Sequence, residues 1–381
     1  MKCNGIDAVS GENTQVSFNG VIDGVDTLLA QPEERIYLSP GFIDIQVNGF
    51  AGVDYNSPVA SAEDIAHSIR CLYATGVTRF FPTVITGSPH DMAGALRNLA
   101  HARGVIHEGP AMEGFHVEGP FISPDDGPRG AHPKQWVRPP DLNEFHRMQD
   151  AAQDLIRLIT VSPEWPETAH FIEEVVREGV AVSIGHTKAE AGQINDAVKA
   201  GATLSTHLGN GAHSVMTRHP NYIWEQLAED RLAASFIVDG IHLGKSFLRV
   251  ALRAKGVERA VLITDAVMPA GCSPGQYKLG EVDVELHPDG SVRLLGGTRL
   301  AGSALLLDHA IGNVMRLTGV TLRDAITMAT RNPARIGRIA KRQRGLAVGE
   351  RADLVRFRYD DEAKEIHVLE TFVDGERVFH G

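Results

Sequence analysis

The regular alternation of apolar β-type runs with helical segments between residues 41 and 264 constrains the fold of this chain most strongly. Eight runs rich in Val, Ile, Leu and Phe lie near residues 41–47, 78–84, 111–117, 155–161, 180–184, 202–206, 234–238 and 260–264. Strands that alternate with helices build a parallel sheet. Eight strand–helix units are the number that closes such a sheet, so the pattern predicts a TIM-type (β/α)8 barrel.

Local signals place several helices and one insertion. Ser61-Ala62-Glu63-Asp64 predicts a capped helix start, and Thr187-x-x-Glu190 predicts a capping box at another. After the eighth run, alternation on both sides of Pro288-Asp289-Gly290 predicts a hairpin insertion near residues 277–297. Further helical spacing follows near residues 303–317 and 321–330.

The two ends of the chain differ from its middle. Residues 1–41 and 344–381 read as short β segments separated by turn residues. Neither end has enough apolar residues for its own core, so we expect them to pair into one discontinuous β-sandwich domain. The barrel and its insertion would then occupy residues 42–343.

Composition excludes several functional classes. The 381 residues include 37 Lys and Arg against 48 Asp and Glu, which gives a net charge of −11. No basic stripe offsets this acidic balance, so the sequence argues against nucleic-acid binding. The three cysteines lie far apart in the sequence. This spacing argues against both a disulfide framework and a thiolate zinc site. The N-terminus resembles no signal peptide and no run reaches transmembrane length, so we expect a cytoplasmic protein without a membrane partner.

Ligand-type residues stand where four of the apolar runs end. These residues are Glu118 in GFHVEGP, His186 in VAVSIGHT, His207 in ATLSTHLGN and Asp265 in AVLITDA. Active sites of this barrel form at the carboxyl ends of the strands. Each residue alone could be a hydrogen-bonded loop residue, but one Glu and two His at strand ends together favour a catalytic metal site. Three protein ligands leave a coordination position for water, as hydrolysis requires.

Asp265 has a separate predicted role. No cationic residue stands near it in ITDAVMPAG. A carboxylate beside an activated water can accept its proton and pass it to a leaving amine. The alternative is a helix cap or a hydrogen-bond partner of a ligand histidine. Its position at a strand end favours the catalytic role.

Ordered motifs then connect the chain to a known family. PGFIDIQVNGFAG, HVEGPF, the Gly-Ala-His of residues 130–132, GHTKAE, THLGN, DGIH, LITDA and LAGS occur in this order over nearly the whole chain. Together they resemble the N-acetylglucosamine-6-phosphate deacetylase family of the amidohydrolase superfamily. The resemblance implies metal-dependent removal of acetate from N-acetylglucosamine 6-phosphate, which yields glucosamine 6-phosphate in amino-sugar catabolism.

The resemblance also implies roles for individual residues. Glu118, His186 and His207 match the metal ligands, and Asp265 matches the catalytic acid/base. The substrate-contacting positions correspond to Ala131, His132, Asn210, Gly211, His242, Leu300, Ala301 and Gly302. Arg218 matches a phosphate-binding arginine that reaches in from the other subunit of a homodimer. Because the family's ligand set is complete without His116, this histidine is expected to play a supporting role.

Three departures from the family pattern modify these expectations. Gln46-Val47-Asn48 replaces the His-x-His that holds a second metal in many amidohydrolases. Some deacetylases of the family share Gln-x-Asn and use one metal, so we expect one divalent metal per chain, zinc above Fe²⁺, Mn²⁺ or Co²⁺. His207-Leu208-Gly209-Asn210-Gly211-Ala212 replaces His-Leu-Tyr-Asn-Ala-Met, so we expect the smaller residues to reshape the sugar pocket. Arg218-His219-Pro220-Asn221 replaces Arg-Glu-Pro-Gly, so a plain surface arginine is the alternative to a phosphate ligand.

The expected reaction begins when Asp265 takes a proton from a metal-polarised water that attacks the amide. His242 or His132 would donate to the developing oxyanion, and Asp265 would then protonate the sugar nitrogen. Related alternatives are an unphosphorylated or epimeric N-acetylhexosamine, or another N-acyl compound. The sequence also leaves open a non-catalytic barrel that binds a sugar phosphate. An isomerase with Asp265 as its base would leave the metal ligands without a purpose.

Overall fold

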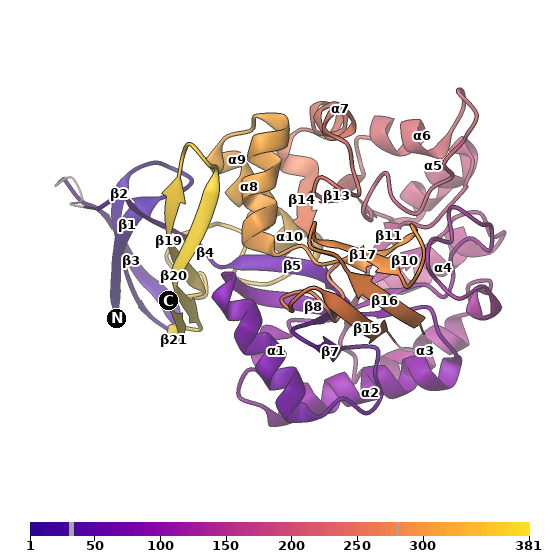
Figure 1. The fold of residues 1–381 in the computed structure, drawn as a ribbon, viewed down its shortest axis with the longest axis horizontal. Coiled ribbons are helices and arrows are strands. Elements are labelled where there is room, and N and C mark those ends of the chain that lie inside the picture. Colours follow the sequence, from indigo (N-terminus) through magenta and orange to yellow (C-terminus); the bar gives the residue numbers. More distant parts are fainter. Residues whose placement is uncertain (30–33, 280–281) are drawn as a thin grey trace.

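The structure is a computed structural model that describes residues 1–29, 34–279 and 282–381. Its centre is a parallel sheet with the neighbour order β14-β13-β12-β11-β10-β9-β8-β5 (Figure 1). The strands are β5 (Phe42–Val47), β8 (Val77–Ile85), β9 (Phe115–Glu118), β10 (Ile156–Val161), β11 (Ala181–Ile184), β12 (Leu204–Ser205), β13 (Ala233–Ile237) and β14 (Ala260–Ile263). Each overlaps its predicted run, although β9 begins four residues later than the run at 111–117, and the barrel is confirmed.

The first and last strands meet near the carboxyl ends of the barrel. A parallel bridge joins Val47 to Ala266, and Asn48 N donates a 2.7 Å hydrogen bond to Ala266 O. One residue earlier, Asp265 N donates to Gln46 O over 3.0 Å. The ring of strands therefore closes at the face on which the ligand-type residues lie.

Helices surround the barrel and cover its outer face. They are α1 (Ala62–Ala74), α2 (Pro89–Val105), α3 (Leu142–Ala151), α4 (Thr168–Arg177), α5 (Ala191–Ala200), α6 (Tyr222–Ala228), α7 (Lys245–Lys255), α8 (Leu307–Thr318), α9 (Leu322–Ala329) and α10 (Arg331–Ile336). Short 3-10 helices occupy Gly109–Ala111, Lys134–Trp136 and Val257–Arg259. Every residue of β11, β13 and β14 is buried, because side chains fill the barrel on one face and helices cover the other.

The two predicted helix starts have different outcomes. Ser61 caps α1, since its side chain accepts a hydrogen bond from Asp64 N. The capping box predicted at Thr187 was wrong, because α5 is capped by Glu190 and Gln193. The Thr187 hydroxyl instead accepts hydrogen bonds from Ala189 N and from the hydroxyl of Ser162 in the preceding strand–helix loop.

Both chain ends form one sheet beside the barrel, as predicted. Its order is β21-β20-β19-β4-β1-β2-β3, with strands β1 (Lys2–Asp7), β2 (Asn13–Asn19), β3 (Val21–Thr27), β4 (Ile36–Pro40), β19 (Leu354–Asp360), β20 (Glu365–Val373) and β21 (Glu376–His380). The rings of Phe18 on β2 and Phe372 on β20 lie 5.6 Å apart, although these strands are not neighbours. The sheet is therefore folded over on itself, and its two halves pack face to face as in a sandwich (Figure 1).

A buried cluster of ion pairs connects the sheet built from both chain ends to the barrel. Arg79 on β8 donates hydrogen bonds of 2.8 and 2.9 Å to Asp353, the residue before β19, and Arg342 forms a second ion pair with the same carboxylate. All three side chains are at most 2% exposed. Burial alone would favour protonation, but Arg342 and Arg79 hold the pKa of Asp353 well below its usual range.

The insertion after β14 is larger than predicted. The expected hairpin exists as the turn between β16 (Val282–Leu286) and β17 (Ser291–Leu294). Strands β15 (Gly275–Leu279) and β18 (Leu300–Ser303) extend it to four antiparallel strands. A two-stranded ribbon, β6 (Gly49–Phe50) and β7 (Val53–Asp54), follows β5. Because Ser303 N donates to Asp265 O over 3.2 Å, the insertion returns to the predicted site.

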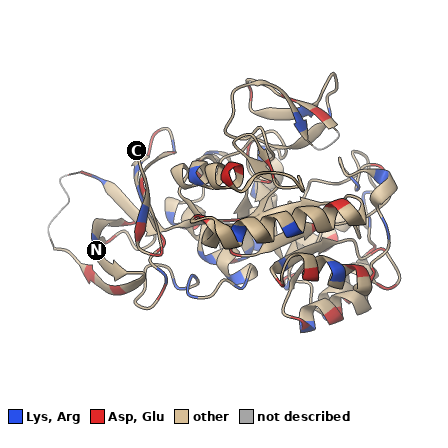
Figure 2. Cartoon of the chain, turned by 90° about the horizontal axis from the view of Figure 1, so that it is seen from below, with Lys and Arg blue, Asp and Glu red and all other residues tan. Residues whose placement is uncertain are grey.

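In the view of Figure 2, the Lys and Arg segments are spread over the ribbon together with Asp and Glu. Segments of both signs occur on the helices of that view, and the net charge of the chain is −11. Among the described residues, no helix is both long and apolar enough to cross a membrane.

Candidate metal-dependent active site

The structure brings the three predicted ligands into contact at the carboxyl face of the barrel. Glu118 ends β9, while His186 and His207 each lie two residues beyond a strand, β11 and β12. His207 Nε2 lies 2.8 Å from Glu118 Oε1, and His186 Nε2 lies 3.3 Å from the same oxygen. One ligand-type atom from each residue lies within 4.8 Å of the others, and all three residues are buried.

The backbone at these strand ends adopts an uncommon conformation. The φ angles are +48° at His186, +29° at His207 and +51° at Asp265. Residues other than glycine rarely adopt this left-handed backbone conformation, which costs about 1–2 kcal/mol per residue. Strain of this kind collects at functional sites, where the surrounding structure imposes it. The left-handed conformation turns the chain at the end of each strand, and the side chain of the turning residue lies in the site.

The donor set fits a divalent metal. His186 Nδ1 hydrogen-bonds the carbonyl of Pro128 at 2.8 Å, which leaves the lone pair on Nε2. Although burial would favour protonation, the close contacts with His186 and His207 hold the pKa of Glu118 well below its usual range. Two imidazoles and one ionised carboxylate suit zinc and also other divalent transition metals. The chain therefore offers one three-residue metal site among its described residues.

Two amides occupy the positions of the His-x-His motif. Gln46 Nε2 donates to Glu118 Oε1 over 2.9 Å and to Asp265 Oδ1 over 3.2 Å. The hydroxyl of Thr206 donates to Gln46 Oε1 over 2.9 Å, which orients the amide nitrogen toward the two carboxylates. Asn48 Nδ2 adds a 2.7 Å hydrogen bond to Asp265 Oδ1. Both amides thus act as hydrogen-bond donors to the acidic residues of the site.

Asp265 has the environment of a general base. Burial raises the pKa of its carboxyl to about 6, and the nearby Glu118 carboxylate adds to the rise. A base with this pKa is ionised at neutral pH yet can hold a proton during turnover. Both amide hydrogen bonds end on Oδ1, so Oδ2 is the oxygen suited to proton transfer.

His132 lies directly against the ligands. Its Nε2 is 3.2 Å from His186 Nε2, and its Nδ1 is hydrogen-bonded to the hydroxyl of Thr86 at 2.8 Å. Burial and the neighbouring His186 lower the pKa of His132 to about 3, which keeps the ring neutral near pH 7. Ala131, the preceding residue, is exposed at the edge of the site. The predicted substrate-contacting pair is thus adjacent to the metal ligands.

His242 and Asn210 are each held by a neighbour in the sequence. His242 Nδ1 is paired with Asp239 Oδ2 at 2.6 Å, and His242 N donates to Asp239 Oδ1 over 2.8 Å. Asp239 was not predicted as a site residue, although the Asp-Gly-Ile-His motif, which places it three residues before His242, is a signal for it. Asn210 Nδ2 donates to His207 O over 3.3 Å. These contacts fix the loops after β13 and β12.

Two glycines in the loop after His207 are required by packing. A Cβ atom at Gly211 would lie 2.7 Å from His186 Nδ1, and φ is +54° at this residue. A Cβ atom at Gly209 would lie 2.7 Å from the ring of Phe247, where φ is +103°. His186 and Phe247 of α7 therefore leave no room for a side chain at these two positions.

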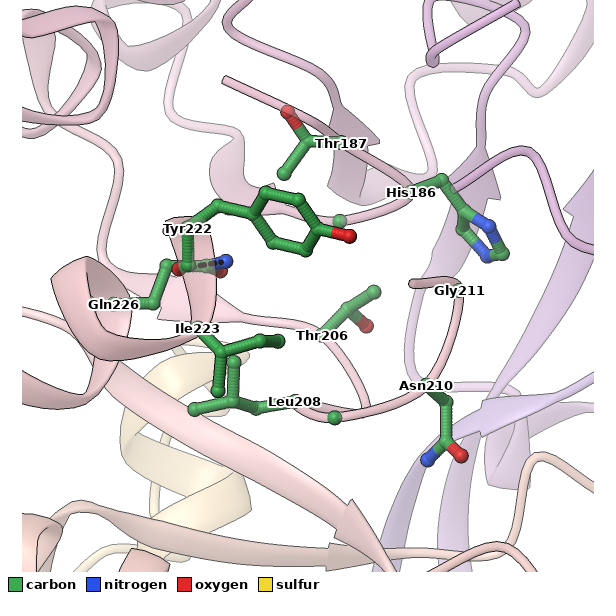
Figure 3. A pocket seen from close by; sticks show the side chains of 11 residues that line it. His186, Thr187, Thr206, Leu208, Asn210, Gly211, Tyr222, Ile223 and Gln226 are labelled. Carbon is green, nitrogen blue, oxygen red and sulfur yellow. Dashed lines mark hydrogen bonds between the residues drawn. The ribbon is translucent and has the colours of Figure 1, made fainter. Parts of the chain in front are cut away.

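A small pocket lies on the other side of this loop (Figure 3). The ring of Tyr222 extends into it from α6, opposite His186. Its lining residues are Gly185, His186, Thr187, Thr206, Leu208, Gly209, Asn210, Gly211, Tyr222, Ile223 and Gln226. The pocket thus shares His186 with the predicted metal site and Asn210 and Gly211 with the predicted substrate contacts.

The remaining predicted residues have different settings. Leu300, Ala301 and Gly302 lie on β18, and a Cβ atom at Gly302 would lie 2.3 Å from Val267. Arg218 is exposed on the loop between β12 and α6, and its guanidinium pairs with no described residue. The structure of one chain therefore does not bring Arg218 to the three ligands.

His116 is a polar residue of the barrel interior. It is fully buried, and its Nε2 is hydrogen-bonded to the hydroxyl of Thr160 at 2.7 Å. Burial lowers its pKa to about 4, so the ring is neutral near pH 7. These contacts agree with a supporting role below Glu118.

Known proteins resemble this chain in sequence and structure. The model of the amidohydrolase family matches residues 37–378. N-acetylglucosamine-6-phosphate deacetylase of Bos taurus is 34% identical over 90% of this chain and 83% of that protein. The Bacillus subtilis (strain 168) protein of the same name is 34% identical over 85% of this chain and 81% of that protein.

Solved structures of the same name extend this similarity to the fold. N-acetyl-D-glucosamine-6-phosphate deacetylase of Mycobacterium smegmatis, solved as a mutant with N-acetyl-D-glucosamine-6-phosphate, has a TM-score of 0.88, 28% identity and 99% coverage of both chains. The Thermotoga maritima enzyme has a TM-score of 0.86, 29% identity and full coverage of both chains.

Proposed function

The chain belongs to the amidohydrolase family, and we propose that it hydrolyses the N-acetyl group of N-acetylglucosamine 6-phosphate to give glucosamine 6-phosphate and acetate. The observation that carries this function is the buried group of Glu118, His186 and His207 with the Asp265 carboxylate beside it. Two relatives that this chain covers over more than four-fifths of their length are named N-acetylglucosamine-6-phosphate deacetylase.

The three ligands would hold one divalent metal, with zinc as the proposed ion. Such a metal supplies Lewis acidity, which lowers the pKa of a water molecule and polarises the acetyl carbonyl. The amides of Gln46 and Asn48 support a single metal, because each is engaged as a donor to a carboxylate. Neither offers the imidazole nitrogen that a second metal would require.

Asp265 moves the proton in this mechanism. Its Oδ2 accepts the proton of the attacking water as the new C–O bond forms at the amide carbon. The same oxygen then delivers the proton to the sugar nitrogen as the C–N bond breaks, so acetate and a free amine leave. Two hydrogen bonds on Oδ1 hold the carboxylate in place through both transfers.

His132 and His242 would recognise the substrate. A neutral His132 can donate one N–H to an oxygen that gains negative charge, and its contact with Thr86 limits the orientation of the ring. The Asp239 carboxylate accepts from Nδ1 of His242, which leaves the lone pair of Nε2 free to accept a hydrogen bond from a substrate hydroxyl.

Phosphate recognition by Arg218 belongs to the same proposal. A guanidinium presents paired donors that match phosphate oxygens. The exposed position of Arg218 in one chain agrees with a contribution to the site of a second subunit in a homodimer. We further propose that the enzyme acts in the cytoplasm, where phosphorylated amino sugars would be its substrates.

Acetate release from N-acetylglucosamine 6-phosphate and from free N-acetylglucosamine, measured together with bound metal, tests the function. We expect turnover of the phosphorylated sugar with about one metal per chain. An Arg218→Met variant should raise KM for the phosphorylated sugar, whereas Arg147→Met on the exposed face of α3 should not. Turnover of the free sugar alone would contradict the phosphate claim, and absence of turnover on both despite bound metal would contradict the substrate assignment.

A further inference from the structure

A fully buried carboxylate with no role in the mechanism lies beneath the site. Asp44 belongs to β5 within the PGFIDIQVNGFAG motif, and its exposed fraction is 0%. It is two residues before Gln46, and neither of its carboxylate oxygens has a recorded contact with Glu118, His186 or His207 among the described residues. A buried charged group of this kind requires hydrogen-bond partners, so its partners indicate its purpose.

The hydrogen-bond partners of Asp44 among the described residues lie at the seam where the barrel closes. Its Oδ2 accepts a 2.6 Å hydrogen bond from the hydroxyl of Thr264 and a 3.2 Å bond from Thr264 N. Its Oδ1 accepts from Gln46 N over 3.1 Å. β5 and β14 are the two ends of the hydrogen-bonded strand order, and their backbones are joined only from Gln46 and Asp265 onward among the described residues. The carboxylate thus links the two strands where their backbone ladder is missing.

These contacts enclose the turn that carries the catalytic carboxylate. The hydroxyl of Thr264 accepts a 3.1 Å hydrogen bond from Ala266 N, so one threonine side chain spans Asp265. Asp265 N donates to Gln46 O over 3.0 Å, on the strand that Asp44 also holds. Between these fixed points the backbone of Asp265 keeps its strained φ of +51°. A residue so constrained depends on its neighbours for its conformation.

We propose that Asp44 is a positioning residue for the hydrolytic reaction, which acts through Thr264 and Gln46 to hold Asp265 in its catalytic orientation. The inference rests on the proposed function and adds a residue to it that touches neither substrate nor metal. A carboxylate suits this place because three donors converge on it, and an ionised carboxylate offers acceptors only. Hydrogen bonds to an ionised acceptor are also shorter and stronger than neutral ones.

The Asp44→Asn variant removes the charge and preserves the shape. Its amide oxygen can still accept from Gln46 N, and its amide nitrogen can donate to the hydroxyl of Thr264, so the fold should persist. Thr264→Val and Thr264→Ser form the matched pair, because serine keeps the bridging hydroxyl and valine removes it. Burial raises the pKa of Asp44 to about 7. Assays at about pH 8 therefore keep most of the carboxylate ionised.

We expect Asp44→Asn and Thr264→Val to lower kcat by about 10–100-fold, as small displacements of a catalytic group do. KM and bound metal should remain near wild-type values, and Thr264→Ser should recover most of kcat. In a chain that already carries Asp265→Asn, Asp44→Asn should cause no further loss of kcat. A residue that merely stabilises the fold would instead lower metal content or the unfolding midpoint and would affect both backgrounds alike.

A crystal structure of Asp44→Asn separates this inference from the proposed function, because it requires no turnover. We expect the hydrogen bond between Asn48 Nδ2 and Asp265 Oδ1, now 2.7 Å, to lengthen or break. An unchanged Asp265 geometry, or an equal loss of kcat in the Asp265→Asn background, would overturn the positioning role. If Asp44→Asn does not fold, the comparison of Thr264→Val with Thr264→Ser tests the positioning role instead. Equal kcat values for these two variants would overturn that role. An inactive wild-type enzyme would count against the proposed substrate, while the geometry of Asp265 in the variant would still decide the role of Asp44.

Discussion

Asn48 donates a 2.7 Å hydrogen bond to Oδ1 of Asp265, from the end of the first barrel strand to the residue after the last. This bond opposes the effect of burial on Asp265, because a donor stabilises the ionised carboxylate. The strength of the base in this enzyme is therefore set by a balance between burial and an amide that replaces a histidine of the superfamily. The balance can be measured through the pH dependence of turnover.

The wild-type pH profile should have an acidic limb near the pKa of Asp265, which is about 6. Below this pH the carboxyl is protonated and cannot accept a proton from water, so kcat/KM should fall as pH decreases. Asn48→Ala removes a donor to the ionised form, which should raise the pKa and move the limb to higher pH. Asn143→Ala on exposed α3 is the control and should leave the limb in place. A limb that moves to lower pH in Asn48→Ala would contradict this account.

Asp265→Asn should retain the fold and the metal but lose most activity. The amide has nearly the same shape as the carboxyl, yet it cannot accept the proton of the attacking water. General acid–base catalysis contributes about 10²–10⁴-fold, and kcat should fall by a factor in this range. Acetate release with bound metal measured on the same sample provides the test. Wild-type turnover in this variant would remove Asp265 from the mechanism.

The elements of this structure that follow local patterns could be predicted from the sequence. The eight strands appear as apolar runs, and Glu118, His186 and His207 stand at their ends. The start of α5 was misplaced because the Thr187 hydroxyl is engaged by Ser162, a residue 25 positions earlier. Such competition between partners has no local signature.

The support of the site was not predictable for a similar reason. Thr206 meets Gln46 across 160 positions of the sequence, and Asp44 meets Thr264 across 220 positions. The left-handed backbone at His186, His207 and Asp265 was also not predictable, because only a small fraction of residues other than glycine adopt it, although Asp and His are enriched among them. Only the closed barrel brings these groups together, so their roles become visible in the structure.

Gly211→Ala should weaken metal binding through His186. The added methyl group would lie 2.7 Å from His186 Nδ1, which hydrogen-bonds Pro128 O. An alanine at the positive φ of residue 211 also adds about 1 kcal/mol of backbone strain. Because partners of ligand histidines typically affect metal affinity by about 10–100-fold, we expect a loss in this range. Competition with a chelator measures it, with Gly192→Ala, where the space around Cβ is open, as the control.

Asp353→Asn should destabilise the junction between the sandwich domain and the barrel. The substitution leaves Arg79 and Arg342 buried without their shared carboxylate. Breaking a buried ion pair on one side costs about 3–5 kcal/mol, and urea unfolding should show a loss of this size. Asp361→Asn removes an exposed partner of Lys364 and should leave the unfolding midpoint unchanged. Equal midpoints for wild type and Asp353→Asn would show that the cluster contributes little to stability.

Glu118→Gln should separate metal binding from the rest of the fold. The amide keeps the size of the side chain but is a poor metal ligand, and it loses the charge that attracts His186 and His207. Added Zn²⁺ should raise the unfolding midpoint of the metal-free wild type, since a ligand that binds only the folded state stabilises it. The same addition should have little effect on Glu118→Gln, and acetate release should be lost with the metal. His170→Gln on exposed α4 should behave as the wild type. A Zn²⁺-dependent rise of equal size in Glu118→Gln would place the metal elsewhere in the chain.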